Sequence, residues 1–177
     1  MPARSHARGK RYRPPPALVF GTSEHLLAFG FGLGLVPVAP GTFGTLLGVP
    51  LWWLLCWLPP QIYGFVVAAL FGLGCWVTGR SARLLGSHDD PGIVFDEVVG
   101  FLIAASPLLY SLGWAQGNHW WWLLAAFVLF RGFDIVKPIP IRWLDQLVGG
   151  GLGIMLDDAV AGLFAAVPLG LAAWFLG

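Results

Sequence analysis

Two pairs of adjacent acidic residues are the features of this sequence that could carry chemistry. Asp96-Glu97 and Asp157-Asp158 each open a long apolar segment in a chain that otherwise has few charges. A carboxylate near a membrane is costly unless it is paired, hydrated or bound to a metal, so we interpret both pairs as parts of a functional site. Carboxylates without His or Cys partners suit a hard cation. Mg²⁺ is the expected one, because it is commonly held by a few carboxylates together with substrate phosphate.

Basic residues lie near a further acidic position, Asp134. Arg131 precedes it by three residues, so the two side chains can share one helix face. Lys137 and Arg142 follow in a turn that is stiffened by prolines. Cations beside carboxylates indicate recognition of phosphate, which Arg can bind through two parallel hydrogen bonds.

Each of these features also has a simpler interpretation. An isolated acidic pair can be a solvated helix N-terminus that the helix dipole favours. Lys137 and Arg142, taken alone, can be the positive charges that mark the cytoplasmic side of a membrane protein.

The composition predicts an integral membrane protein. Hydrophobic residues make up 57% of the chain and charged residues 11%, and the mean hydropathy is +0.75. From Leu26 to Gly79 there is no Asp, Glu, Lys, Arg or His. Many of the ten Trp residues lie near the ends of apolar segments, as the residues of aromatic belts do. The alternative is a soluble helical bundle with an unusually apolar core.

The expected architecture is all-α, a compact membrane bundle with about four to five spanning helices and short interfacial helices. Residues 1–22 are expected to form a basic, flexible cytoplasmic arm, and residues 23–177 a helical membrane domain. A short helix is predicted from Glu24 towards Leu33, and the prolines and glycine that follow must end it. Each spanning candidate has enough residues to cross the hydrocarbon core as a helix; the candidates are residues 43–58, 62–78, 96–112, 119–134 and 158–175.

The distribution of Lys and Arg predicts one orientation. If the basic arm is cytoplasmic, each predicted hairpin returns to the cytoplasmic side, and every Lys and Arg lies there. The same topology puts the Pro-Gly-Thr loop at 40–42, both acidic pairs and Asp134 on that face of the membrane. The arm is expected to contact anionic membrane lipid, and no nucleic acid partner is expected.

Four sequence blocks resemble the phosphatidylglycerophosphatase A family and occur in the same order. The resemblance runs from about His25 to the last predicted helix and leaves out the arm before residue 22. The blocks are GLGLVPVAPGTFG at 32–44, IVFDEVVG at 93–100, FRGFDIVKPIPIRWLD at 130–145 and GGLGIMLDDAVAG at 150–162.

The resemblance implies an all-helical, Mg²⁺-dependent phosphatase of the bacterial cytoplasmic (inner) membrane, with several membrane passes and its active site on the cytoplasmic face. Such an enzyme would hydrolyse phosphatidylglycerophosphate to phosphatidylglycerol and inorganic phosphate, in phosphatidylglycerol biosynthesis. The acidic motifs of the family map onto Asp96, Glu97, Asp134, Asp157 and Asp158, and its basic positions map onto Arg131, Lys137 and Arg142.

Our hypothesis for the metal uses both acidic pairs. Glu97, Asp157 and Asp158 would hold Mg²⁺, and Asp96 would be either a further ligand or the base that orients the attacking water.

Our hypothesis for the phosphate uses the cations. Arg131, Lys137 and Arg142 would bind the terminal phosphate and offset its charge. Asp134 would orient Arg131 or complete the metal shell. Backbone N–H groups of the Pro-Gly loop, or the hydroxyl of Thr42, would add contacts to the phosphate.

Other functions could use the same residues. A cation transporter or channel could use these interfacial carboxylates, and acids near the bilayer midplane within broken helices would favour it. A non-catalytic lipid-binding protein and a phosphatase for another phospholipid monoester, such as phosphatidic acid, are further alternatives. Acids at segment ends, beside cations, favour the phosphatase.

Overall fold

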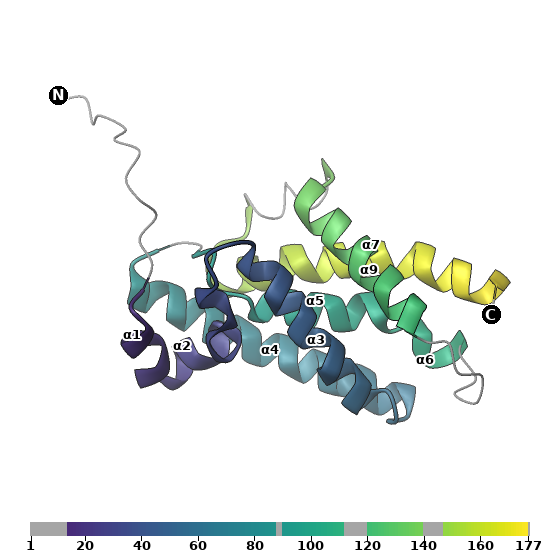
Figure 1. Cartoon of the computed structure of the whole chain (residues 1–177), viewed down its shortest axis with the longest axis horizontal. Helices are drawn as coiled ribbons and strands as arrows, with labels where there is room; N and C mark the ends of the chain where they lie inside the picture. The colour runs from purple at the N-terminus through teal and green to yellow at the C-terminus, as the bar shows by residue number, and fades with distance from the viewer. Residues whose placement is uncertain (1–13, 88–89, 112–119, 140–146, 177) are drawn as a thin grey trace.

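The helices over residues 60–85, 95–105 and 150–176 run along the long axis of the molecule, and those over residues 40–55 and 120–136 run obliquely to it (Figure 1). The computed structural model describes residues 14–87, 90–111, 120–139 and 147–176, and within these ranges it is all-α, with no strand. The predicted fold class is therefore confirmed at this level. The elements in chain order are α1 (Pro16–Gly21), α2 (Ser23–Ala28), the 3-10 helix η1 (Gly30–Leu35), α3 (Pro40–Leu55), α4 (Pro60–Leu85), α5 (Phe95–Ala105), α6 (Leu108–Ser111), α7 (Trp120–Val136) and α9 (Gly150–Leu176).

The short helix α5 lies at the centre of the bundle. It packs against α3, α4, α7 and α9, and most of its residues are buried. We predicted one helix over residues 96–112, but α5 ends at Ala105 and α6 starts at Leu108. Pro107 lacks the backbone N–H that would continue the hydrogen bonds of α5, so the helix ends before it and a new one starts after it.

Glycines let α5 and α9 cross with their backbones almost in contact. A Cβ at Gly100 would lie 2.6 Å from the ring of Phe130 and 2.8 Å from the carbonyl oxygen of Asp158, and a Cβ at Gly162 would overlap the carbonyl of Gly100. A larger residue at either position would push the helices apart. Glu97 lies about one turn before Gly100, and Asp158 about one turn before Gly162, so this crossing fixes how far apart the two carboxylates lie.

The N-terminal elements pack against the C-terminal end of α4. Val19 of α1 is fully buried, and Nδ1 of the buried His25 lies 2.7 Å from Oγ of Ser81. Burial lowers the pKa of His25, so the ring is neutral in this contact at neutral pH. Glu24 Oε1 lies 2.7 Å from Nε of Arg80. Residues 16–21, which we expected in a flexible arm, therefore form a packed helix; residues 1–13 lie outside the described part.

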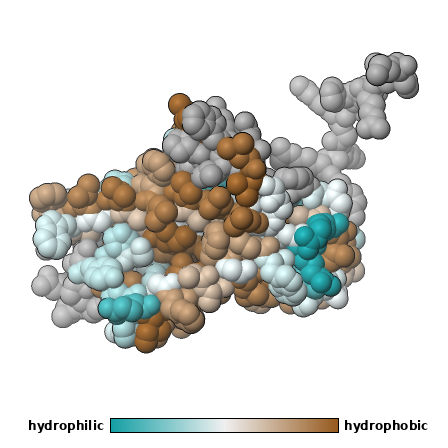
Figure 2. All heavy atoms as spheres, turned by 180° about the vertical axis from the view of Figure 1, so that it is seen from behind, coloured by the Kyte–Doolittle hydropathy of each residue, from teal (hydrophilic) through white to brown (hydrophobic). Residues whose placement is uncertain are grey.

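In the described part of the chain, two helices are long and apolar enough to cross a membrane, α4 over Pro60–Leu85 and α9 over Gly150–Phe175. Both are longer than the predicted segments 62–78 and 158–175. The predicted segments 43–58 and 119–134 correspond to α3 and α7, which have 16 and 17 residues. Large apolar side chains also lie on the outside: Leu54 is 72% exposed and Phe65 75%. Figure 2 shows that the face behind the view of Figure 1 is largely apolar, with strongly hydrophilic atoms only in small areas near its two ends.

Replacing Gly162 with Ala should destabilise the fold by roughly 1–3 kcal/mol, because the added methyl group overlaps the carbonyl of Gly100. Gly64→Ala is the matched control. Gly64 lies in α4 with nothing within 4 Å of an added Cβ, so alanine there should be neutral or slightly stabilising. Thermal unfolding of both variants in the same detergent measures the difference. Equal melting temperatures would contradict the close crossing of α5 and α9.

Candidate metal and phosphate site

A polar cavity of about 250 Å³ opens where the N-terminal ends of α3, α5 and α9 meet the C-terminal end of α7. Segments far apart in the sequence therefore deliver their charged residues to one place. The charged residues in its lining are Asp96, Glu97, Arg131, Asp134, Lys137, Asp157 and Asp158. The structure thus brings together all five acidic residues that the sequence singled out, with two of the three cations.

Three carboxylates in this cavity are close enough to share one ion. Asp96 and Glu97 come from the first turn of α5 and Asp158 comes from α9, and one ligand atom from each lies within 4.8 Å of the others. Glu97 Oε2 and Asp158 Oδ2 are buried and have no hydrogen-bond partner among the described residues. Like charges at this distance repel each other, and a buried acceptor without a donor is costly. A divalent cation would relieve both costs, so the residues fit a metal with oxygen ligands.

Asp157 has a different environment from the three clustered carboxylates. Its Oδ2 lies 2.5 Å from Nζ of Lys137, and its Oδ1 accepts a hydrogen bond of 3.0 Å from the backbone N–H of Asp158. We expected Asp157 among the metal ligands, but the group within 4.8 Å consists of Asp96, Glu97 and Asp158. Its ion pair with Lys137 directs the carboxylate of Asp157 away from the three clustered carboxylates.

Lys137 reaches the cavity from a strained backbone position. It follows the last residue of α7 with φ of +43°, and its N–H donates to the carbonyl of Phe133 at 2.9 Å. This left-handed conformation, which ends many helices, favours glycine because a side chain there is strained. A lysine in it indicates that the amine is needed where the backbone puts it.

Arg131 lies between two acidic groups. Its Nη1 is 2.5 Å from Oδ2 of Asp134, one turn along α7, and 3.8 Å from Oε1 of Glu97. Its Nε is buried and makes no hydrogen bond within the described part of the chain. The guanidinium group is therefore oriented by Asp134 and retains a donor for an anion in the cavity.

The start of α3 forms another wall of the cavity. Ala39 has φ of +49°, and the helix begins with Pro40 and Gly41, which both line the cavity. A Cβ at Gly41 would overlap the carboxylate of Glu97 and lie 3.1 Å from Nη1 of Arg131. Helix N-termini present unpaired N–H groups that suit anions.

Two predicted site residues remain, Thr42 and Arg142. Thr42 is half-buried in the first turn of α3 and does not line the cavity. Arg142 lies outside the described residues. The sequence indicated the Pro-Gly-Thr loop but not Gly41 in particular. Gly41 could have been found as a glycine at the second position of a predicted helix. The sequence also did not indicate Pro91, which lies in the wall of the cavity.

Comparisons with known proteins agree on one family. The family model described as Phosphatidylglycerophosphatase A matches residues 26–173. The chain is 45% identical over 142 residues to Phosphatidylglycerophosphatase A of Escherichia coli (strain K12), covering 80% of this chain and 78% of that protein. It is 45% identical over 146 residues to Phosphatidylglycerophosphatase A of Haemophilus influenzae, covering 81% and 84%.

A third relative carries a different, provisional name. A Bacteroides thetaiotaomicron protein provisionally named phosphatidylinositol-3-phosphatase is 38% identical over 158 residues, covering 86% of this chain and 94% of that protein. No solved structure matches the chain significantly.

Replacing Gly41 with Ala should weaken binding of Mg²⁺ or Mn²⁺ at least about tenfold, because the new methyl group displaces the carboxylate of Glu97. Gly132→Ala is the matched control: Gly132 adjoins Arg131 on α7, and nothing lies within 4 Å of a Cβ there. The melting temperature, titrated with each ion, measures the affinity. Unchanged affinity in the Gly41 variant would remove the start of α3 from the site.

Proposed function

Because the chain belongs to the phosphatidylglycerophosphatase A family, we propose that its polar cavity is where phosphatidylglycerophosphate is hydrolysed to phosphatidylglycerol and inorganic phosphate. Membership of the family makes the chain a phosphatidylglycerophosphatase. The assignment of the reaction to the cavity rests on one observation. Three clustered carboxylates from α5 and α9 meet two cations from the end of α7 in this cavity. A cation transporter would have no need for Arg131 and Lys137 among the acids.

The proposed cofactor is Mg²⁺, held by Glu97 and Asp158, with Asp96 beside it as the base for the attacking water. When bound, it would supply positive charge to the phosphoryl oxygens and to the attacking water. The support is chemical: the cluster offers only carboxylate oxygens, which suit Mg²⁺ better than softer metals.

The proposed phosphate ligands are Arg131 and Lys137. Arg131 is held by Asp134, and its buried Nε can donate to a phosphate oxygen. Lys137 is held by Asp157, so Asp134 and Asp157 are positioning residues for the two cations. Arg142 is proposed as a third cation because of its place in the family motif.

The proposed reaction is an in-line attack of water on phosphorus. As the new O–P bond forms, the bond from phosphorus to the glycerol oxygen breaks. Asp96 accepts the proton of the attacking water, and solvent water protonates the glycerol oxygen as it departs on the opposite side of phosphorus. Arg131 and Lys137 offset the negative charge that develops on the phosphoryl oxygens. The backbone N–H of Gly41, at the start of α3 in the cavity wall, adds a donor to the phosphate.

The proposed location is the bacterial cytoplasmic membrane, with the cavity on the cytoplasmic face. α4 and α9 would span the bilayer, and α3, α7 and the pair α5–α6 would lie in the same layer, giving four to five membrane helices. Arg80 and Arg83 lie near the cavity end of α4, as the positive-inside rule requires. The exposed Trp57, Trp120 and Trp174 lie at the helix ends far from the cavity, where an aromatic belt would meet lipid headgroups.

Phosphate release from phosphatidylglycerophosphate in mixed micelles should require Mg²⁺ and stop with EDTA. Glu97→Gln and Asp158→Asn should each lower kcat/KM by at least about 100-fold, because loss of a direct ligand costs more than the roughly 10–100-fold loss for an outer partner. Glu24→Gln is the control, since Glu24 of α2 contacts Arg80 of α4 and does not line the cavity. Activity within twofold of wild type in the Glu97 or Asp158 variant would exclude the proposed metal site.

Lys137→Gly and Lys137→Ala separate the role of the amine from that of the backbone. Both remove the cation, so both should lower kcat/KM roughly 100-fold. Glycine also relieves the strain at φ of +43°, so the glycine variant should be more stable than the alanine variant by about 1 kcal/mol. Phosphate release and melting temperatures test the two effects. An active glycine variant would show that Lys137 does not bind the phosphate.

A further inference from the structure

A second cavity, entirely apolar, lies beside the polar one. This side groove has a volume of about 270 Å³ and runs between η1, α3 and α5. Its wall on α3 is formed by Leu47, Leu51 and Leu54, and its floor by Phe95 and Val98 of α5. Phe31 of η1 stands at one end.

We propose that the side groove binds one fatty acyl chain of the phospholipid whose terminal phosphate occupies the polar cavity. The inference rests on the proposed function and adds to it a subsite for the apolar part of the substrate. A diacyl lipid is a ligand of the right chemistry, since the lining offers it no polar partner.

The groove and the polar cavity share the first turn of α5. On α5, Phe95 and Val98 of the groove flank Asp96 and Glu97 of the polar cavity, so the two sites lie on different faces of the same helical turn, about one helix diameter of 10 Å apart. That separation suits the glycerol and phosphodiester groups that join the terminal phosphate of the lipid to its chains.

The direction of the groove also matches a lipid. Gly41 of α3 lines the polar cavity, and Leu47 lies about 9 Å further along the helix axis. From Leu47 to Leu54 the groove follows α3 for about another 10 Å, away from the charged end of the bundle. An acyl chain in it would therefore point into the apolar layer while its headgroup stays with the charges.

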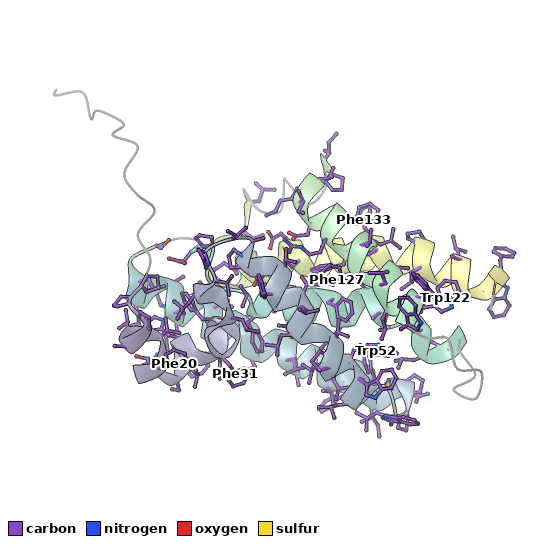
Figure 3. The ribbon with its side chains drawn as sticks, viewed as in Figure 1. Phe20, Phe31, Trp52, Trp122, Phe127 and Phe133 are labelled. Carbon is purple, nitrogen blue, oxygen red and sulfur yellow. The ribbon has the colours of Figure 1, made fainter. Side chains whose placement is uncertain are left out.

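The backbone around Phe31 is strained, which supports a specific role for the Phe31 side chain in the groove. Gly30, Phe31 and Gly32 have φ of +54°, +57° and +96°, a run of left-handed residues of which only Phe31 carries a side chain. Phe31 is 61% exposed, so burial in the core does not explain why a phenylalanine is kept there. Figure 3 shows Phe31 near Phe20 on the outer side of the bundle. The ring of Phe31 can pack here against the acyl chain that enters the groove.

The test compares two substrates with each variant. We would measure kcat/KM for phosphatidylglycerophosphate with 16-carbon chains, at a fixed mole fraction in mixed micelles, and for its dihexanoyl form. Phe31→Gly removes the ring and relieves the backbone strain, and Leu54→Trp fills the open end of the groove at a side chain that is 72% exposed. Leu46→Trp is the matched control, because Leu46 is 54% exposed on α3 and does not line the groove.

The ratio of long-chain to short-chain kcat/KM should fall roughly fivefold to tenfold in the Phe31 and Leu54 variants, as expected when one or two methylene groups lose their contacts. The Leu46 variant should keep the wild-type ratio. Ratios within twofold of wild type in both groove variants, or an equal fall in the Leu46 variant, would overturn the proposal. An equal loss on both substrates would also overturn it, because it indicates damage to the polar cavity.

Photo-crosslinking with a phosphatidylglycerol that carries a diazirine in its acyl chain gives a readout that does not depend on hydrolysis. Crosslinks should map to α3 around Leu51 and be reduced in the Leu54→Trp variant but not in the Leu46→Trp variant. Crosslinks there, without hydrolysis of either substrate by the wild type, would refute the proposed function and leave the acyl site standing. Crosslinks spread evenly over the outer helices would refute the acyl site.

Discussion

Carboxylates that are buried side by side need positive charge, and this requirement organises the charged end of the molecule. Asp96, Glu97 and Asp158 bring ligand atoms to within 4.8 Å of one another, and Asp158 is buried while Asp96 and Glu97 are half-buried. Arg131 supplies part of the missing charge, at 3.8 Å from Glu97, yet buried oxygens of Glu97 and Asp158 keep no hydrogen-bond partner in the described chain. A divalent cation and a phosphate, bound together, would satisfy the remaining acceptors and donors.

The backbone holds that cluster through contacts that tolerate no side chain. Gly100 and Gly162 let α5 and α9 cross closely, and Gly41 lets the start of α3 lie against Glu97. Because α5 is enclosed by four other helices, its first turn has little freedom to move the two carboxylates away from Asp158. The rest of the bundle, with its apolar outer surface, serves as the support that keeps these three backbone segments together in or at a membrane.

Sequence alone predicted the charged residues better than their arrangement. Asp96, Glu97, Asp134, Asp157 and Asp158 stand out because charge is rare in this chain and costly in an apolar environment, and all five line the cavity. Which member of the second pair joins the cluster depends on the rotation of α9 at its glycine crossing, and so the pairing of Asp157 with Lys137 was not predictable. Pro107 could have indicated the end of α5, but the length of the apolar run concealed it. The left-handed run at residues 30–32 is set by tertiary contacts, and so the side groove had no sequence signal.

The most direct test of the account is a double-mutant cycle on the affinity for Mn²⁺, measured by electron paramagnetic resonance of the free ion. The proteins are wild type, Glu97→Gln, Asp158→Asn and the double variant. If Glu97 from α5 and Asp158 from α9 hold one ion, each single variant loses most of the binding and the double variant loses little more. Fully additive losses, or single variants that still bind as wild type does, would contradict a shared metal site and with it the central claim.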